Sequence, residues 1–260
     1  MQHFFVEPSA ITDKTITITG DDVNHIKNVL RMKVDEQISV SDGISDDEYR
    51  CQIISIDDNR VECQIQFIKR DGIELPARVY LFQGLPKSDK MELIIQKAVE
   101  LGVAEVIPVA TKRAVVKLDE KRGKQKVTRW QAISEAAAKQ SKRGYIPKVH
   151  DIISFKQAIA YAKDMTCKAI PYELSEGMSD TRSWIEACKK ACMDVDSKAD
   201  TKPSIAIFIG PEGGFASEEI DMAMEEGILP ISLGKRILRT ETAGLTTLSI
   251  LMYELELLSI

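Results

Sequence analysis

The sequence predicts an α/β protein: a parallel sheet with helices on both faces, preceded by a small β-barrel. Three observations support this fold class. From Ala77 onwards, short apolar runs rich in strand-forming residues alternate with segments of helical period. Residues 1–70 contain several short strand-like runs separated by turn signals. The run Ile205–Ile209 is continuously apolar and stops at Gly210–Gly214, which indicates a buried strand entering a glycine loop.

The first part of the chain is predicted to be β-rich. Its strands are expected at residues 4–6, 15–18, 37–41, 49–56 and 61–68. One helix interrupts them, because Asp21 or Asp22 can cap it and Val23, Ile26 and Leu30 share one face. So many short strands in so few residues indicate a small barrel. Residues 70–76 are typical of a linker, so we expect one domain at 1–72 and a second at 73–260.

The second part is predicted to alternate strand and helix. Strands are expected at residues 78–83, 103–109, 168–172, 204–209 and 230–233. Helices are expected from a cap at Ser88 to Gly102, over 129–141, 154–162 and 184–193, from a cap at Ser217 to 226, and from about Thr242 to the C-terminal region. Trp130 lies on an alanine-rich helix, so the core is a better place for it than a stack on a base.

Charge is segregated along the chain. The net charge of −5 by itself argues against binding to nucleic acid, but residues 109–150 hold twelve Lys or Arg and only three Asp or Glu. Such segregation is what a protein with one phosphate-facing surface shows. A solvated helix face beside a basic loop explains the same pattern, and composition alone does not choose between these interpretations.

Several classes of protein are excluded or disfavoured. No stretch is apolar and long enough to cross a bilayer, and residues 1–8 do not resemble a secretory signal, so we expect a cytoplasmic protein. The five cysteines are scattered; Cys188 and Cys192 lie one helical turn apart but have no second pair to complete a zinc site. With only three histidines, far apart in sequence, we expect no metal.

The glycine loop after the strand at 204–209 predicts a ligand cradle. Glycines let backbone groups approach a ligand closely, and a strand, a glycine loop and a helix start commonly build such a site. Glu212 in this loop would repel a phosphate, and no Lys-Ser or Lys-Thr follows. A neutral or cationic ligand therefore fits better than a nucleoside triphosphate.

The segment 233–244 is the second candidate for a functional loop. As a plain connector it would use Thr240 or Thr242 as a helix cap, with Glu241 favouring the helix dipole. That interpretation does not explain Ile237 and Leu238, which are apolar residues in a loop. They would be liabilities unless they cover something, and a flat aromatic ligand such as adenine is a natural candidate.

Together these segments resemble the SPOUT class of RNA methyltransferases and, within it, the RsmE family. Further matching segments run nearly from end to end of the chain, in the family's order. They are His25–Val34, which is similar to the signature of a PUA-like barrel, then Gln83–Glu92, Gln96–Gly102, and the pairs Arg129-Trp130, Glu135-Ala136 and Gln140-Ser141. His3 stands near where family members often have an arginine, which puts an RNA contact there in doubt.

The resemblance implies a methyltransferase that uses S-adenosylmethionine to modify N3 of a uridine in small-subunit (16S) ribosomal RNA. It also implies a deep trefoil knot in the C-terminal domain and a homodimer formed through that domain, with ribosomal RNA or the 30S subunit as partner. The knot loops would hold the cofactor. The residues carried over to that role are Tyr172, Glu173, Ile209, Gly210, Pro211, Glu212, Gly213, Gly214, Leu233, Gly234, Ile237, Leu238 and Ala243.

The chemistry of that reaction suggests roles for two residues of the last motif. Uridine N3 is a poor nucleophile until it loses its proton, and a guanidinium aimed at a ring oxygen would stabilise the anion. Arg239 is our candidate for this role, and Glu241 would accept the proton or orient the base, although a cap role for Glu241 is an equal alternative. Phosphate contacts are expected from basic side chains at Arg31, Lys87, Lys90, Lys112, Arg113, Lys142 and Arg143.

Two other functions remain open at this stage. A non-catalytic RNA-binding or ribosome-assembly protein would keep the barrel and the basic strip without transferring a methyl group. A nucleotide-dependent enzyme is weaker, because neither Gly-x-Gly-x-x-Gly after a strand nor Gly-x4-Gly-Lys-Ser/Thr occurs.

Overall fold

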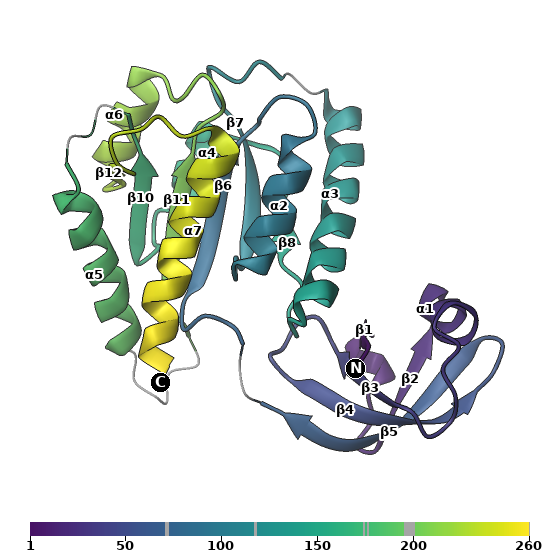
Figure 1. The fold of residues 1–260 in the computed structure, drawn as a ribbon. Coiled ribbons are helices and arrows are strands. Elements are labelled where there is room, and N and C mark those ends of the chain that lie inside the picture. Colours follow the sequence, from purple (N-terminus) through teal and green to yellow (C-terminus); the bar gives the residue numbers. More distant parts are fainter. Residues whose placement is uncertain (71–72, 117–118, 174, 176, 195–200, 260) are drawn as a thin grey trace. The chain divides into compact units, whose positions relative to one another are not determined.

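The chain folds into two compact units in the computed structural model (Figure 1). The structure describes residues 1–70, 73–116, 119–173, 175, 177–194 and 201–259. Contacts divide the chain into a first unit of Met1–Glu74 with Ala138–Ile146, and a second unit of Leu75–Ala137 with Pro147–Ile260. Sequence patterns did not indicate that Ala138–Ile146 would group with the first unit.

The first unit is a curled five-stranded sheet in the order β1-β3-β4-β5-β2 (Figure 1). Its elements are β1 (His3–Phe5), η1 (Pro8–Ala10), β2 (Thr15–Thr19), α1 (Asp21–Asn24), η2 (His25–Val29), β3 (Gln37–Ser41), β4 (Glu48–Ile56) and β5 (Arg60–Lys69). Alternate side chains of the strands fill its core, and Val23 and Ile26 close it from the helical segment. The predicted β-rich unit with one helix is therefore confirmed.

The second unit is a seven-stranded sheet in which every strand pair is parallel. Its order is β12-β10-β11-β6-β7-β8, with β9 also on β7. Its strands are β6 (Arg78–Gly84), β7 (Glu105–Ala110), β8 (Lys148–Val149), β9 (Ile153–Ser154), β10 (Cys167–Pro171), β11 (Ser204–Ile209) and β12 (Leu229–Ile231). Its helices are α2 (Lys90–Glu100), α3 (Glu120–Ser141), α4 (Phe155–Tyr161), α5 (Ser179–Met193), α6 (Ser217–Glu225), α7 (Thr240–Glu256) and η3 (Leu257–Ser259).

Helices cover both faces of this sheet, as predicted. Phe82 and Phe208, stacked with ring centroids 4.4 Å apart, point to the face on which α4 and α6 pack. On the other face α7 packs on β11 and has α2 and α5 beside it (Figure 1). Gly244 of α7 faces Ile209 and Leu81 of the sheet, and a Cβ there would make ordinary contacts at 3.6 and 3.8 Å. The apolar strands are thus buried on both sides, which explains their continuous rather than alternating pattern.

Several element ends differ from the prediction. α3 begins at Glu120 rather than Arg129, and α5 at Ser179 rather than Trp184. The extra turns of α3 are solvated, so they carry no apolar stripe, and the Lys124–Glu120 pair at 2.8 Å supports them instead. Period-based reasoning detects only the turns that pack against the core.

The predicted helix caps are wrong. α1 is capped at Gly20 rather than at Asp21 or Asp22. Ser88 has φ 56° and precedes the cap position of α2, which is Asp89. α6 is capped at Ala216, whose N–H donates to the Glu219 carboxylate at 2.8 Å, and α7 is capped at Arg239 rather than at a threonine. Thr240 of α7 hydrogen-bonds to Gln83 and Gly210 instead of capping the helix. Ser154 caps α4 with Gln157, a cap that the sequence analysis did not predict.

Buried small and aromatic residues agree with the sequence interpretation. Trp130 is 3% exposed and belongs to the core. All five cysteines are free and four of them are buried, as expected of thiols used as small apolar side chains. In the part of the chain that the structure describes, no helix is long and apolar enough to span a membrane. Nor do three or more His, Cys, Asp or Glu side chains among these residues gather as metal ligands would.

A polar network lies at the amino ends of the strands. The Glu105 carboxylate accepts hydrogen bonds from Tyr161 at 3.0 Å and Arg78 at 3.3 Å and contacts His150 Nε2 at 2.5 Å. Burial alone would raise the pKa of Glu105, but these partners outweigh it and hold that pKa below its usual value. The ionised carboxylate therefore stabilises the second unit.

We predict that Glu105→Gln lowers the free energy of unfolding at pH 7 by about 1–2 kcal/mol, because a neutral amide binds these partners less well. A carboxyl group with a lowered folded-state pKa contributes stability above its unfolded pKa of about 4.3 and loses it as pH falls through the folded value. The difference between variant and parent should therefore shrink on acidification from pH 7 to about pH 3. Urea unfolding followed by circular dichroism at both pH values measures it.

Glu120→Gln is the matched control, because Glu120 pairs with Lys124 on the exposed face of α3. It should shift the unfolding midpoint far less than Glu105→Gln does, because an exposed i,i+4 pair contributes little. Equal stability of parent and Glu105→Gln at pH 7, or a difference that grows in acid, would contradict the assignment.

Candidate functional site

A cavity of about 510 Å³ lies at the carboxyl ends of the parallel strands in the second unit. Three loops form it: the residues after β10 (171–173), after β11 (209–215) and after β12 (232–240). β10 pairs with both β11 and β12, so the three loops leave neighbouring strands at the same edge of the sheet. This edge is where open α/β sheets bind ligands, and the volume is typical of a small-molecule site.

Hydrogen bonds tie the three loops to one another. Tyr172 N–H donates to the Ile231 carbonyl at 3.0 Å, and the Thr181 hydroxyl of α5 donates to the Ser232 carbonyl at 2.7 Å. Thr240, at the start of α7, donates its hydroxyl to the Gly210 carbonyl at 2.6 Å. The cavity wall is therefore held together by groups far apart in sequence, and Thr240 serves this purpose instead of capping α7.

Glycine is required where the loop after β11 meets β6. A Cβ on Gly84 would lie 2.8 Å from both Cδ and N of Pro211, closer than real Cβ contacts come. A Cβ on Gly210 would lie 3.2 Å from Gly214, and Gly214 itself has φ 65°. The loop is thus folded tightly on itself and on β6, which leaves its backbone facing the cavity.

The structure brings together nearly all the residues predicted to hold a cofactor. Those that line the cavity are Tyr172, Glu173, Ile209, Gly210, Pro211, Glu212, Gly214, Leu233, Gly234, Ile237, Leu238 and Ala243. Gly213 does not line it: its carbonyl accepts a hydrogen bond from Arg113 at 3.2 Å, and the Arg113 Cβ lies against it. Gly213 therefore faces away from the cavity.

The rim of the cavity carries an exposed apolar side chain. Ile237 is 88% exposed, although it borders the cavity beside Leu238, which is half-buried. Its position at the rim of an apolar-walled cavity offers surface that a bound ligand or partner can cover. The sequence argument that this loop covers a ligand or a partner is consistent with this geometry.

Two carboxylates and one ammonium group form an ionic cluster beside the cavity. Lys90 Nζ lies 3.0 Å from Glu212 and 3.2 Å from Glu241, and Lys87 N–H also donates to Glu212 at 3.1 Å. Burial would raise the pKa of Glu212, but hydrogen bonds from the backbone and Lys90 outweigh it and lower that pKa. Glu212 is therefore ionised at neutral pH.

The two predicted catalytic residues occupy different positions. Arg239 lines the cavity and is exposed, and its guanidinium forms no ion pair or hydrogen bond with the residues that the structure describes. Glu241 does not line the cavity; it lies in the first turn of α7 and pairs with Lys90. Arg239 is thus free to meet a ligand, whereas Glu241 already has a cationic partner.

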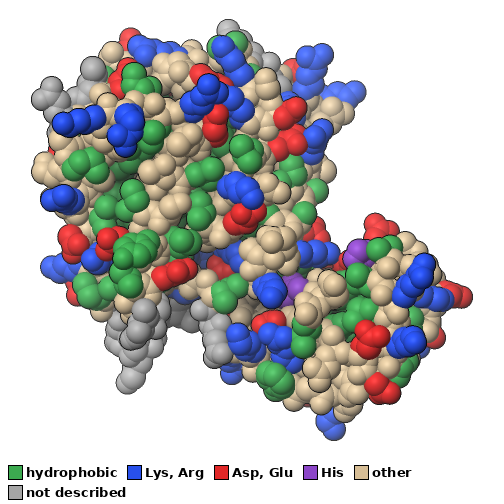
Figure 2. All heavy atoms as spheres, in the orientation of Figure 1, with side chains coloured by type: hydrophobic (Ala, Val, Ile, Leu, Met, Phe, Trp, Pro, Cys, Tyr) green, Lys and Arg blue, Asp and Glu red, His purple; other side chains and the backbone are tan. Residues whose placement is uncertain are grey.

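The basic residues predicted to contact phosphates divide between the two units. Lys87, Lys90, Lys112 and Arg113 lie near the loop after β11 in the second unit, where Lys112 pairs with Glu218 at 3.1 Å. Arg31 and Lys142 are exposed residues of the first unit with φ of 53° and 61°. Figure 2 shows basic side chains interspersed with acidic ones over the face in view, rather than one uninterrupted basic patch.

Arg143 is the exception among these residues. It is 4% exposed, and its guanidinium forms a buried ion pair with Glu74. A buried, paired guanidinium presents no free donor to a phosphate. We therefore leave Arg143 out of the proposed RNA surface and assign it to the packing of Ala138–Ile146 in the first unit.

Some residues of the cavity were missed by sequence reasoning. The wall also includes Lys90, Pro171, Phe215, Ser232, Lys235, Arg236 and Thr240. Gln83 supports it from below, since its side-chain N–H donates to the Thr240 hydroxyl at 2.9 Å and the residue is fully buried. Gln83 could have been recognised from the sequence, because it is a polar residue at the end of an otherwise apolar strand.

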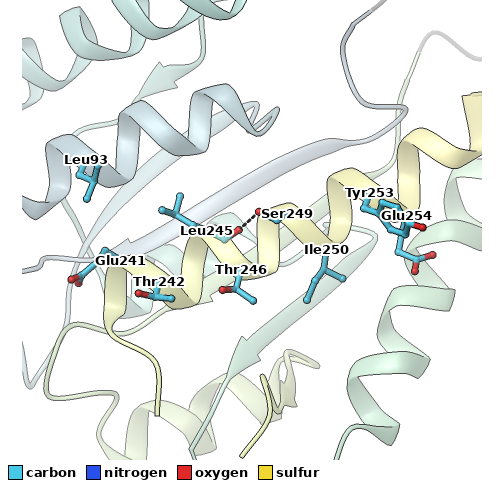
Figure 3. A pocket seen from close by; sticks show the side chains of 9 residues that line it. All are labelled: Leu93, Glu241, Thr242, Leu245, Thr246, Ser249, Ile250, Tyr253 and Glu254. Carbon is cyan, nitrogen blue, oxygen red and sulfur yellow. Dashed lines mark hydrogen bonds between the residues drawn. The ribbon is translucent and has the colours of Figure 1, made fainter. Parts of the chain in front are cut away.

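A second, shallower hollow of about 650 Å³ runs along α7. Figure 3 shows Leu245 of α7 pointing toward the side of Leu93 of α2, with Ile250 and Tyr253 further along α7. Leu93 is 46% exposed and Tyr253 is 63% exposed. The outer face of α7 therefore carries uncovered apolar surface.

Known proteins of similar sequence and fold identify the family. The RNA methyltransferase domain family matches residues 73–252, and the RNA methyltransferase PUA domain family matches residues 18–66. The chain is 38% identical to ribosomal RNA small subunit methyltransferase E of Bacillus subtilis (strain 168), over 99% of this chain and 98% of the relative. The chain belongs to the ribosomal RNA small subunit methyltransferase E family.

Other relatives agree. The enzyme of the same name from Mesomycoplasma hyopneumoniae (strain 232) is 33% identical over 96% of this chain and 98% of its own length. The crystal structure of the Neisseria gonorrhoeae enzyme bound to S-adenosyl methionine superposes with a TM-score of 0.80, at 29% identity and 97% coverage of both chains. The RsmE resemblance and the predicted class, a SPOUT-type α/β domain with an N-terminal PUA-like unit, are confirmed.

Proposed function

We propose that the chain is an S-adenosylmethionine-dependent methyltransferase that acts on small-subunit ribosomal RNA. The observation that carries this proposal is the cavity formed by the three loops after β10, β11 and β12. It lies in a chain whose relative from Neisseria gonorrhoeae was crystallised with S-adenosyl methionine. The alternative of a non-catalytic RNA-binding protein does not explain why the loops build a cavity of this size.

The residues of the cavity suit this cofactor. Tight glycine turns expose backbone groups that can bind adenine and ribose, and Leu238 offers an apolar wall. Glu173 and Glu212 add carboxylates that favour a cationic ligand over a phosphate. When bound, S-adenosylmethionine supplies an already activated methyl group, so the chain needs to provide placement and charge.

We further propose N3 of a uridine as the methyl acceptor. Loss of the N3 proton leaves a negative charge shared with the ring oxygens, and the unpaired guanidinium of Arg239 can stabilise that charge from the cavity wall. Glu241 would accept the proton or orient the base, and its pairing with Lys90 requires a shift on substrate binding before it could act as the base.

RNA would be bound by both units. We propose that a PUA-like domain of residues 1–72 and a methyltransferase domain of residues 73–260 share this task. Their exposed basic residues Arg31, Lys87, Lys112, Arg113 and Lys142 would contact phosphates. Since ribosomal RNA is the substrate in this proposal, we place the protein in the cytoplasm and expect either free RNA or the 30S subunit as its partner.

The proposal includes a homodimer and a trefoil knot in the second unit. The apolar hollow along α7 is a suitable surface for a second copy, because self-association would bury Tyr253, Leu93 and Ile250 (Figure 3). Glu241 and Thr242, at the N-terminal end of this hollow, adjoin the loop that closes the cofactor cavity. A dimer would therefore complete the surroundings of that cavity.

We predict that S-adenosylhomocysteine and S-adenosylmethionine raise the melting temperature of the protein, whereas ATP and NAD do not. Ligands that bind only the folded state stabilise it by mass action. Ribosomal RNA from a strain lacking the protein should gain one methyl group in vitro, and mass mapping should place it on uridine N3. Absence of binding by calorimetry would refute the proposal, and a methyl on another atom would refute only the uridine assignment.

Arg239→Ala should reduce the methyl-transfer rate by about 10²–10³-fold, because a donor aimed at developing negative charge contributes about that much. Affinity for S-adenosylhomocysteine should change little if Arg239 acts on the uridine. Arg182→Ala, which removes an exposed guanidinium from α5, is the matched control and should keep the parent rate. A rate for Arg239→Ala within threefold of parent would exclude the assigned role.

Ile250→Asp should convert the proposed dimer to a monomer, since a charge in an apolar interface must be desolvated without a partner. Size-exclusion chromatography with light scattering measures the mass of parent and variant. Met224→Asp, on the exposed surface of α6, is the control and should keep the parent mass. A parent protein that is monomeric at micromolar concentration would refute the dimer.

A further inference from the structure

Lys90 was expected to contact RNA phosphates, but its surroundings point to a different role. Its ammonium group lies within 3.2 Å of both Glu212 and Glu241, and its side chain is 29% exposed. Hydrogen bonds to the two carboxylates raise the pKa of Lys90. A cation in the first turn of a helix opposes the helix dipole, so its position in α2 needs another source of stabilisation, and the two carboxylates supply it.

The three members of this cluster come from three separate segments. Lys90 begins α2, Glu212 is in the loop after β11, and Glu241 is in the first turn of α7. The side chains of Glu212 and Glu241 are 26% and 16% exposed. Two partly buried carboxylates that share one counter-ion would repel each other without it.

A second set of contacts joins the same segments independently. Gln83, at the end of β6, donates to Thr240, and Thr240 donates to the Gly210 carbonyl. Lys87 N–H, between β6 and α2, donates to the Glu212 carboxylate. The loop after β11 is thus fixed at both Gly210 and Glu212, and these are residues that line the cofactor cavity.

We propose that Lys90 is a positioning residue that holds Glu212 and Glu241 together and thereby fixes two of the three loops of the cofactor cavity. The inference rests on the proposed function, because it names the cofactor as the ligand whose affinity depends on this contact. In this role Lys90 acts on cofactor binding by holding Glu212 and Glu241, and it does not contact RNA.

The test compares cofactor affinity in the absence of RNA. Lys90→Met keeps the length of the side chain and removes the charge, and S-adenosylhomocysteine binding by calorimetry should weaken by about three- to tenfold, as is typical of coupling within one charged network. Lys90→Arg should restore affinity to within about twofold, since a guanidinium can bind two carboxylates. Lys97→Met is the matched control, because among the described residues Lys97 pairs with Glu100 of its own helix and with no other acid, and it should bind like parent.

A double-mutant cycle separates positioning from a general loss of structure. In a Glu241→Gln background the two acids no longer repel each other fully, so Lys90→Met should then weaken binding by less than half of its effect in the parent, on a logarithmic scale. If Lys90→Met does not fold, Lys90→Ala replaces it in both backgrounds, because alanine favours the helix at this partly exposed position.

Other results would overturn the proposal. Parent-like cofactor affinity of Lys90→Met, or equal effects of Lys90→Met in both backgrounds, would show that the cluster does not set the cavity. Weaker RNA binding with a smaller salt dependence and unchanged cofactor affinity would make Lys90 a phosphate contact. Failure of the parent itself to bind S-adenosylhomocysteine would refute the proposed function instead, so the two failures are distinguishable.

Discussion

The parallel pairing of β10 with β11 and β12 is the constraint on which the candidate site depends. Parallel strands end at the same edge of a sheet, so this register gathers three loops that follow residues 171, 209 and 231 in the sequence. Hydrogen bonds from Tyr172, Thr181 and Thr240 then close the loops around one cavity. A change of register would move each loop separately, and the cavity wall would no longer be continuous.

Which charged side chains near the cavity are free to bind a ligand depends on their ion pairs as well as on the composition of the chain. Glu212 and Glu241 share Lys90, Arg143 is buried with Glu74, and Lys112 pairs with Glu218. The first two arrangements remove Lys90 and Arg143 from the expected phosphate contacts, whereas the Lys112–Glu218 pair is exposed and leaves Lys112 able to meet a phosphate. Arg239 is different, because its guanidinium forms no such pair within the described residues, and this makes it the candidate for meeting a developing negative charge.

Much of the fold followed from local patterns, and the failures have a common cause. The strand Ser204–Ile209 is found with its predicted bounds, since a buried strand between a loop and glycines has sharp limits in sequence. The start of α3 and the caps of α2, α6 and α7 were misplaced. Each depends on charge pairs or on contacts with distant segments, such as Thr240 with Gly210, and periodicity does not report such contacts.

The sequence by itself determined the α/β class, the β-rich N-terminal unit and most residues of the cavity, because apolar period, glycine loops and family motifs are local properties of the chain. Only the tertiary structure decided which charges are paired and which are free. Lys90, Arg113 and Arg143 resemble one another as basic residues in sequence, yet one joins two acids, one binds a loop carbonyl and one is buried. Distance and burial decide the strength of an electrostatic contact, and both arise only when remote segments are packed together.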